Sequence, residues 1–160
     1  MNYYNQIAAS YEELHREEQL AKLRIIKENL KLEGNEKILD IGCGQCWSTE
    51  FFDNVVGIDP AFGLLDKRKS VVNGMAEQLP FLDHSFDIIL CVTAVHHFDI
   101  ERAISEMKRI AKNDAVYVIT VLKKVVEKER IAGAIKASFR LKMAIEEDKD
   151  VILFLSNPTS

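Results

Sequence analysis

Apolar residues along this chain follow two periods, one typical of helices and one typical of strands. Over residues 3–31 they recur about every 3.6 positions with Glu and Lys between them, which predicts an amphipathic helix, or two helices joined near Ala9 and Ser10. Asp99 is a suitable N-cap for a helix that runs through Ala111, and a long helix is expected over 125–146. Short apolar runs between these segments predict strands at 38–41, 55–59, 71–72, 85–92, 115–122 and 150–155.

Strands that alternate with helices favour right-handed βαβ units and a parallel sheet. The nearly continuous apolar run at 85–92 is typical of a strand that is covered on both faces. Shorter helices are expected at 46–52 and 60–67. We therefore predict an α/β fold with a Rossmann-like, doubly wound, mainly parallel sheet of about six strands and helices on both faces. Residues 1–160 form one domain, with an N-terminal helical region (1–33), a core (36–122) and a last helix and strand (123–160).

Composition narrows the class of protein. The chain has 160 residues, of which 48% are hydrophobic and 29% charged, as in a globular domain. A net charge of −4 argues against a general binder of polyanions. Residues 123–142 are locally basic, with seven Lys or Arg and two Glu, which indicates either a solvated helix face or a contact for an acidic or phosphate-bearing partner. No membrane-spanning run or secretory signal is evident, so we expect a cytoplasmic protein.

Candidate binding residues follow four of the predicted strands. Ligands of such sheets bind beyond the carboxyl ends of the strands, where the winding reverses. An acid at the end of the second strand, Asp59, lies 17 residues after Gly42, which is the placement of an acid that binds ribose hydroxyls. The complete set is Asp40 and Gly42 after the first strand, Asp59 at the end of the second, Met75, Ala76 and Glu77 after the third, and Cys91 to His97 after the fourth.

The turn after the first strand favours a cationic ligand over a pyrophosphate. Its sequence, Gly42 to Trp47, lacks the last glycine of the G-x-G-x-x-G pattern, and a bulky Trp47 stands there instead. The carboxylate of Asp40 would repel a phosphate but attract the amino group of a methionine moiety. The residues therefore favour S-adenosylmethionine over a dinucleotide.

These motifs together resemble those of class I S-adenosylmethionine-dependent methyltransferases, and most of all the branch that includes the ubiquinone and menaquinone biosynthesis enzymes. The resemblance covers about residues 36–112, with a weaker similarity at 4–11. The motifs that carry it are Ile38–Gly44, Val56–Asp59, Gly74–Phe81, Asp83–Asp87 and His96–Phe98.

The resemblance implies a role for each matching residue. Residues near the methionine and ribose parts of the cofactor would be Asp40, Gly42, Cys43 and Gly44, with Cys91 and Val92 at the methionine end. Asp59 would bind the ribose hydroxyls, Pro60 would lie beside the adenine, and Ala76 would offer backbone groups to the adenine edge. The N-terminal helices would form a lid over the cofactor, with Tyr4 and Tyr11 as lid residues.

The chain departs from the family at three places. Cys46 replaces a third glycine, so that the turn would fit its ligand less closely. Met75 replaces an acid that binds the adenine amino group, a function that either Glu77 or backbone contacts would take over. The final strand at 151–155 follows the long helix without the usual further elements, which indicates that substrate-covering insertions are missing.

Other chemistries remain open on the same residues. Cys43 and Cys46 have the spacing of a redox pair and, together with His96 and His97, the ligand types of a zinc site. Both are less favoured than cofactor binding, because the cofactor would occupy this loop, and no metal is expected. Either His96 or His97 is a candidate general base, while the alternative is that His97 packs under the helix and His96 lines the pocket.

We therefore predict a methyltransferase that acts on an unidentified acceptor, with a small molecule favoured. One alternative is a cofactor-binding subunit without catalysis of its own. Another is an RNA or protein methyltransferase that depends on a partner and docks through the basic 123–142 helix. The segment Val151–Leu155, if it is an exposed sheet edge, would permit a homodimer.

Overall fold

The computed structural model describes residues 3–159, without the side chains of residues 3–5 and 7. The predicted lid role of the Tyr4 side chain therefore lies outside the described part. Three α-helices and seven strands make up the regular structure of this part, together with three single-turn 3₁₀ helices. The elements are α1 (Tyr3–Glu28), β1 (Ile38–Ile41), η1 (Trp47–Glu50), β2 (Val55–Asp59), η2 (Phe62–Leu64), β3 (Val71–Asn73), β4 (Phe86–Cys91), η3 (Val95–His97), α2 (Ile100–Ile110), β5 (Ala111–Leu122), α3 (Lys128–Ser138), β6 (Arg140–Glu146) and β7 (Asp150–Ser156).

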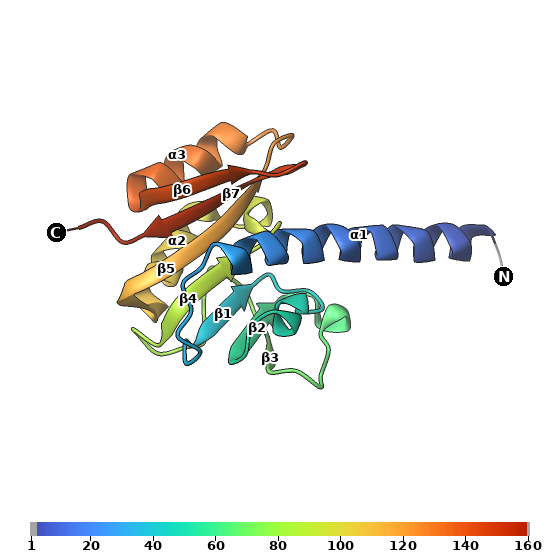
Figure 1. Cartoon of the computed structure of the whole chain (residues 1–160), viewed down its shortest axis with the longest axis horizontal. Coiled ribbons are helices and arrows are strands. Elements are labelled where there is room, and N and C mark those ends of the chain that lie inside the picture. The colour runs from blue at the N-terminus through green and yellow to red at the C-terminus, as the bar shows by residue number, and fades with distance from the viewer. Residues whose placement is uncertain (1–2, 160) are drawn as a thin grey trace.

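The strands form one sheet in the order β3-β2-β1-β4-β5-β7-β6 (Figure 1). The first five of these are parallel, and β7 runs antiparallel to both of its neighbours. The predicted α/β fold with a mainly parallel sheet is confirmed. The sheet winds in opposite directions from β1 and β4, so the switch point expected to bind a ligand lies between these two strands.

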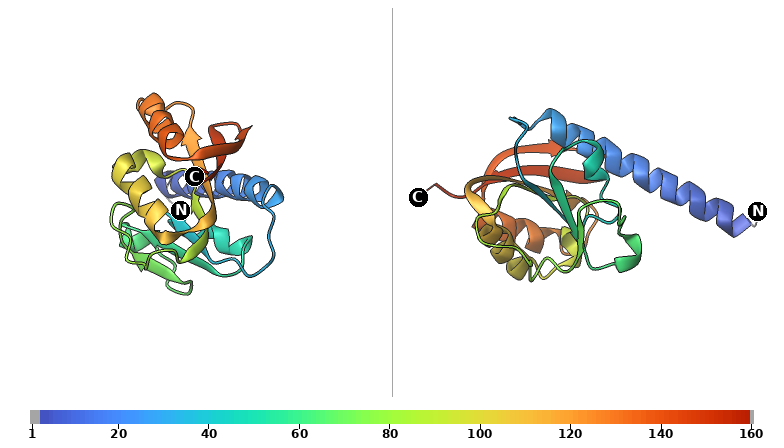
Figure 2. Two further views of the ribbon diagram at one scale, coloured as in Figure 1. Left: turned by 90° about the vertical axis from the view of Figure 1, so that its left-hand side faces the viewer. Right: turned by 90° about the horizontal axis from the view of Figure 1, so that it is seen from below.

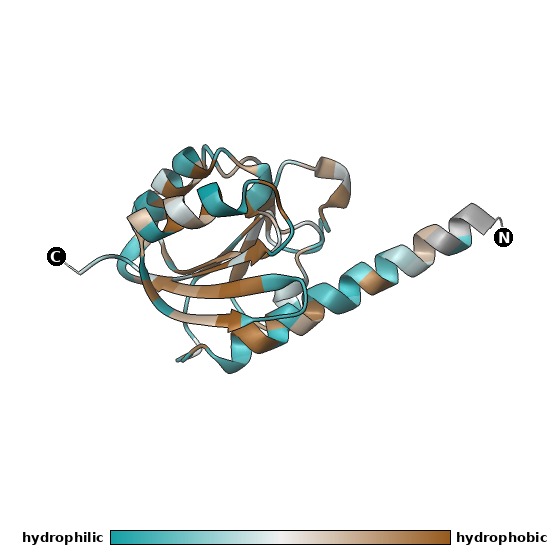
Figure 3. Cartoon of the chain, turned by 90° about the horizontal axis from the view of Figure 1, so that it is seen from above, coloured by the Kyte–Doolittle hydropathy of each residue, from teal (hydrophilic) through white to brown (hydrophobic). Residues whose placement is uncertain are grey.

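Both faces of the sheet are covered, as predicted (Figures 1 and 2). Successive side chains of a strand point to opposite faces, and this alternation explains the continuous apolar runs. Ile38 and Ile88 pack with the C-terminal half of α1, whereas Leu39 and Ile89 belong to the cluster that includes α2 and α3. In Figure 3 the strands are largely brown, and the part of α1 that projects from the body is mostly teal or pale.

The predicted long helix over 125–146 is wrong. Helix α3 ends at Ser138, Phe139 is extended with φ −130° and ψ 159°, and Arg140 begins β6. Burial alternates along β6: Met143 and Ile145 are partly buried on the face that α1 covers, whereas their neighbours Lys142, Ala144 and Glu146 are exposed. This period of two suits a strand, and β6 is the seventh strand that the prediction of about six omitted.

The predicted exposed edge at Val151–Leu155 is also wrong. These residues belong to β7, which pairs with β5 on one side and with β6 on the other. Because the backbone of β7 is paired on both sides, a dimer cannot form through it. The edge of the sheet is β6, where a register shift between Leu141 and Met143 and the charges of Arg140 and Lys142 disfavour further pairing.

The remaining predicted helices differ in length from the observed ones. The structure has one continuous α1 with no joint near Ala9 and Ser10, and the turns η1 and η2 replace the predicted helices at 46–52 and 60–67. The N-cap of α2 is as predicted, since Oδ1 of Asp99 accepts a hydrogen bond from the backbone N–H of Arg102 at 3.4 Å. None of the described helices is both long and apolar enough to cross a membrane.

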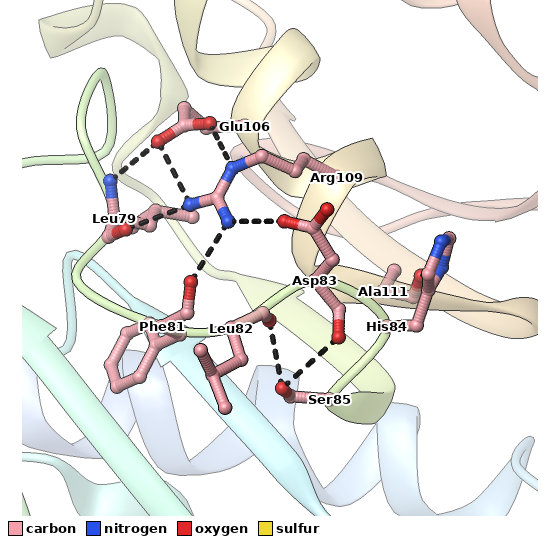
Figure 4. A network of polar contacts seen from close by, with 9 residues as sticks. All are labelled: Leu79, Phe81, Leu82, Asp83, His84, Ser85, Glu106, Arg109 and Ala111. Atoms are coloured by element: carbon pink, nitrogen blue, oxygen red, sulfur yellow. Dashed lines mark hydrogen bonds and ion pairs between the residues drawn. The ribbon is translucent and has the colours of Figure 1, made fainter.

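A polar network holds the segment between β3 and β4 against α2 (Figure 4). The guanidinium of Arg109 donates to the carbonyl oxygens of Leu79 and Phe81, both at 2.8 Å. It also pairs with Asp83 at 2.8 Å and with Glu106 at 2.6 Å. Glu106 in turn accepts from the backbone N–H of Leu79 at 2.9 Å. One side chain thereby satisfies the backbone of a segment that has no regular secondary structure.

Replacing Arg109 by Met should lower the free energy of unfolding by about 2 kcal/mol, because two carbonyl groups and two carboxylates lose a donor. The matched control is Arg68→Met, since the Arg68 side chain is 91% exposed and pairs only with nearby Asp66. An exposed pair of this kind contributes less than about 1 kcal/mol. Urea denaturation of both variants measures the difference, and equal losses would contradict the structural role of Arg109.

Candidate functional site

A cavity of about 430 Å³ lies at the carboxyl ends of the central strands. It opens on the face that α1 covers, and its walls come from the turns after β1, β2 and β4 and from α1 itself. A volume of this size is in the range of small-molecule binding sites. The predicted site residues that line it are Asp40, Gly42, Cys43, Gly44, Asp59, Pro60, Val92, Thr93, Ala94 and His97.

The turn after β1 depends on glycine at two positions. Gly42 and Gly44 have φ values of +70° and +54°, which side chains rarely adopt. A Cβ on Gly42 would lie 2.5 Å from the Cβ of Ala94, so its absence lets the turn after β4 pack directly on the turn after β1. A Cβ on Gly44 would have no neighbour within 4 Å. Gly44 therefore presents bare backbone to the cavity.

Cys46 takes the place of the third glycine without opening the turn. Its φ of 57° is left-handed, as a glycine's would be, and its side chain is fully buried. A Cβ on Gly57 would lie 2.6 Å from the sulfur of Cys46 and 2.6 Å from that of Cys43. The two thiols thus occupy the space beside Gly57 and pack between β2 and the turn.

This packing weighs against the alternative chemistries of the cysteines. Of the two, only Cys43 lines the cavity, and its hydrogen bond with Cys46, followed by burial, raises the pKa of its thiol. The same hydrogen bond lowers the pKa of the Cys46 thiol, but Cys46 is fully buried, whereas a redox pair needs an accessible thiolate. Within residues 3–159, no three His, Cys, Asp or Glu side chains gather in a way that could hold a metal ion, so the zinc alternative is not supported.

Asp40 places a buried carboxyl group at the cavity. One oxygen accepts a hydrogen bond from the hydroxyl of Ser48 at 2.6 Å. Burial raises the pKa of Asp40 to about 7, and the nearby negative charge of Asp59 adds to this effect. A cation in the cavity would favour the ionised carboxylate, so the site is suited to bind a positive charge.

Asp59 is held by backbone donors at the end of β2. Its two oxygens accept from the N–H groups of Gly44 at 2.9 Å and of Ala61 at 2.8 Å. Each carboxylate oxygen can still accept a second hydrogen bond. Two fixed acceptors at the rim of a cavity are suited to bind a pair of neighbouring hydroxyl groups, as the sequence predicts for a ribose.

The sequence analysis predicted that the N-terminal helical region covers the site, but it missed the residues of α1 that form the wall. His15, Gln19 and Leu23 line the cavity, and the His15 ring meets the edge of Trp47 with ring centroids 5.7 Å apart. Their spacing of four residues places all three on one face of a helix. This spacing was a signal that could have identified them, but the two polar residues did not fit the apolar pattern that defined the helix. The other unpredicted lining residues are Gln45, Trp47, Ser48, Ala61, Leu64 and Phe98.

The two histidines after β4 have different surroundings. His97 lines the cavity. The Nδ1 atom of His96 is buried without a hydrogen-bond partner in the described part of the chain, and burial lowers the pKa of this ring. The alternative in which His96 lines the pocket and His97 is packed away from it is therefore wrong, because His97 lines the cavity and His96 does not.

Some of the predicted residues do not line the cavity. Cys91 points to the face of α2, because it is one residue from Leu90 and Val92, which lie on the face of α1. Ala76 is buried in the same cluster as Cys91, and Met75 is half exposed. Tyr11 is 71% exposed on the projecting part of α1. The predicted residues outside the lining are Met75, Ala76, Glu77, Cys91, Val95, His96 and Tyr11.

Comparison with known proteins gives a family and several relatives. The family model described as a methyltransferase domain matches residues 39–119. An uncharacterised protein of Methanocaldococcus jannaschii is 31% identical over 159 residues, which covers 94% of this chain and 62% of that protein. The chain spans between 44% and 62% of the curated relatives that it matches.

Two solved structures share the fold. A SAM-dependent methyltransferase of Aquifex aeolicus has a TM-score of 0.69 at 18% identity, and the match covers 83% of this chain and 88% of that one. A chain from the complex between the Trm112 methyltransferase activator and a putative methyltransferase of Haloferax volcanii has a TM-score of 0.75 at 14% identity. This second match covers 99% of both chains.

The raised pKa of Asp40 predicts a stability that falls with pH. The folded state holds a proton on Asp40 up to about pH 7, whereas the unfolded state loses it near pH 4, so unfolding releases a proton between these values. The free energy of unfolding should therefore decrease as the pH rises from about 4 to about 7, by up to about 4 kcal/mol from this residue. Asp40→Asn should remove this part of the decrease.

Urea denaturation at several pH values tests the prediction, with Asp53→Asn as the control because Asp53 is exposed and outside the cavity. The control should follow the wild-type curve. Parallel curves for the wild type and Asp40→Asn would show that the carboxyl group is not the source of the pH dependence.

Proposed function

The chain belongs to the methyltransferase-domain family, and from this premise we propose that its cavity binds S-adenosylmethionine and serves methyl transfer to a small-molecule acceptor. The observation that carries the proposal is that Asp40 and Asp59 both line the cavity, beside the turn that contains Gly42 and Gly44. Asp40 is suited to bind a cation, and Asp59 is suited to bind two neighbouring hydroxyl groups. S-adenosylmethionine carries an ammonium group and two ribose hydroxyl groups.

Membership of the family confirms the class of enzyme predicted from the motifs, together with S-adenosylmethionine as the cofactor of that class. The assignment to the ubiquinone and menaquinone branch stays a prediction. Since the chain spans between 44% and 62% of its curated relatives, the activity of the whole protein is proposed rather than inherited from them.

The residues of the cavity fit this cofactor. Asp40 would pair with the ammonium group of the methionine part, and the bare backbone of Gly44 leaves room for close approach. Asp59 would accept from the ribose hydroxyls, and Pro60 and Leu64 would supply apolar surface for the adenine. The segment 75–77 lies outside the lining, so an adenine contact from Ala76 or Glu77 is not part of this proposal.

The bound cofactor supplies a methyl group on a positively charged sulfur, which is electrophilic. The work left to the protein is to orient the acceptor and to exclude water, since alignment of the two reactants supplies much of the rate enhancement. Val92, Phe98 and Leu23 give the cavity apolar walls for this purpose. His97 is the residue placed to accept a proton from an acceptor hydroxyl or amine, whereas the buried Nδ1 of His96 is not.

A small-molecule acceptor fits the charge distribution better than a nucleic acid. The basic segment 123–142 is not one helix, and acids lie beside two of its seven cations. Lys123 lies 4.0 Å from Glu146, and Arg130 pairs with Glu101 at 3.2 Å and with Glu127 at 3.7 Å. The Haloferax volcanii neighbour makes an activating partner the second candidate, in which case this chain would need another protein for activity.

Binding of S-adenosylhomocysteine tests the proposal directly. Titration calorimetry should show binding to the wild type, and Asp59→Ala should weaken it roughly 10- to 100-fold through the loss of charge-assisted hydrogen bonds. Asp53→Ala is the matched control, because it removes an exposed acid from the connection between β1 and β2 and should bind like the wild type. Absence of binding to the folded wild type would refute the proposed cofactor.

Proton release gives a second measure that depends on Asp40. At pH 6 the carboxyl group is mostly protonated, and a bound ammonium group would favour its ionised form. Binding should therefore release up to about one proton, which calorimetry in buffers of different ionisation enthalpy detects as a change in apparent enthalpy. Asp40→Asn should abolish that buffer dependence. If the wild type binds without any buffer dependence, the ammonium group does not lie beside Asp40.

A further inference from the structure

Thr93 has a strained backbone at the edge of the cavity. It follows β4 and has a φ of +56°, a conformation that a β-branched residue rarely adopts. Such residues persist only where the surrounding structure holds them, and they concentrate at functional sites. The backbone N–H of Thr93 donates to the hydroxyl of Thr120 on β5 at 2.6 Å. A specific hydrogen bond therefore helps to hold the strained backbone of Thr93 in place.

The side chain of Thr93 is held by a buried ion pair. Its hydroxyl accepts from the ammonium of Lys22 at 2.9 Å and from the amide of Gln19 at 3.2 Å, both on α1. It lies 3.4 Å from a carboxylate oxygen of Asp150, the first residue of β7. Lys22 and Asp150 are 2.8 Å apart, and their side chains are 2% and 0% exposed. One hydroxyl group thus joins α1, β7 and the turn after β4.

This cluster lies behind two walls of the cavity. Gln19 and Leu23 flank Lys22 on α1 and line the cavity, whereas Lys22 itself does not. Thr93 and Ala94 form the adjoining wall, and the Cβ of Ala94 packs on the α-carbon of Gly42. A shift of the ion pair would therefore move α1, the turn after β4 and the contact with the glycine turn together.

The charges of Lys22 and Asp150 are not explained by stability alone. A buried ion pair must lose its hydration, and apolar residues of similar volume often stabilise a protein as well or better. What the charged groups add is direction, because donors and acceptors fix the position of the Thr93 hydroxyl in a way that apolar packing does not. The geometry points to a positioning function.

We propose that Lys22 and Asp150 are positioning residues, which set the shape of the cavity by holding Thr93 in its left-handed conformation and α1 against it. The proposal rests on the proposed function of the cavity as the S-adenosylmethionine site. Neither residue touches the cavity, and both act through Thr93 and Gln19.

The test replaces both charges at once. Lys22→Met with Asp150→Leu removes the pair without leaving one charge buried alone, so the melting temperature should stay near that of the wild type. Affinity for S-adenosylhomocysteine should nevertheless fall by about tenfold or more, because the walls are no longer held in register. Thr93→Val should weaken binding in the same way, and Thr93→Ser, which keeps the hydroxyl, should restore affinity to within about twofold.

The chain offers a matched control for the loss of an ion pair. Lys149 and Glu18 join α1 to the turn before β7, as Lys22 and Asp150 do, but at the surface. Replacing both Lys149 and Glu18 by Ala should leave the affinity unchanged. Unchanged affinity in the Lys22→Met, Asp150→Leu variant as well would overturn the proposal. If that variant fails to fold, the affinities of Thr93→Val and Thr93→Ser are compared instead, and equal affinities would overturn the proposal.

Trp47 provides a readout that needs no ligand. It is the single tryptophan of the chain, it lines the cavity, and it contacts His15 on α1. Acrylamide should quench its fluorescence more strongly in the Lys22→Met, Asp150→Leu variant, and equal quenching would contradict the positioning role. If the wild type fails to bind S-adenosylhomocysteine, the proposed function is refuted. The positioning of α1 would then be tested by the difference in acrylamide quenching between the wild type and the double variant.

Discussion

The contact between the α-carbon of Gly42 and the methyl group of Ala94 is the one on which the rest of the site depends. It brings the turns that follow β1 and β4 together at the switch point of the sheet, where a Cβ on Gly42 would come within 2.5 Å of Ala94. Both turns use left-handed backbone, at Gly42, Gly44 and Cys46 on one side and at Thr93 on the other. The chain can therefore reverse sharply at two neighbouring strand ends and leave a cavity between them.

The second requirement is a cover for that cavity, and α1 supplies it from the opposite end of the sequence. Its apolar residues Leu23 and Ile26 pack on the sheet, while its buried Lys22 reaches Asp150 at the start of β7. Apolar packing fixes which face α1 covers, and the ion pair fixes its position along that face. The same helix can thus present His15 and Gln19 to a ligand and support the turn beneath them.

The electrostatics of the cavity follow from burial more than from net charge. Asp40 and Asp59 are both largely buried within one small site, and burial raises the pKa of Asp40 to about 7. Backbone donors compensate Asp59, whereas Asp40 accepts from the hydroxyl of Ser48 and, at 4.0 Å, from the thiol of Cys46. A ligand that carries one positive charge and neighbouring hydroxyl groups complements this arrangement. The basic segment after β5 is divided between α3 and β6, and two of its cations, Lys123 and Arg130, lie beside acids.

Local pattern by itself determined the central strands, the glycine turn, Asp40 and Asp59, and helix α2 with its cap at Asp99. These features depend on residues that are adjacent in sequence, and strand ends of a parallel sheet meet at one edge whatever covers them. The tertiary structure decided what depends on distant partners. Residues 140–146 form β6 because β7 pairs with them and α1 shares their apolar face, and this overrides a weak local preference for helix. The same dependence on distant partners placed His97 rather than His96 in the cavity, turned Cys91 toward α2, and brought His15, Gln19 and Trp47 to the site.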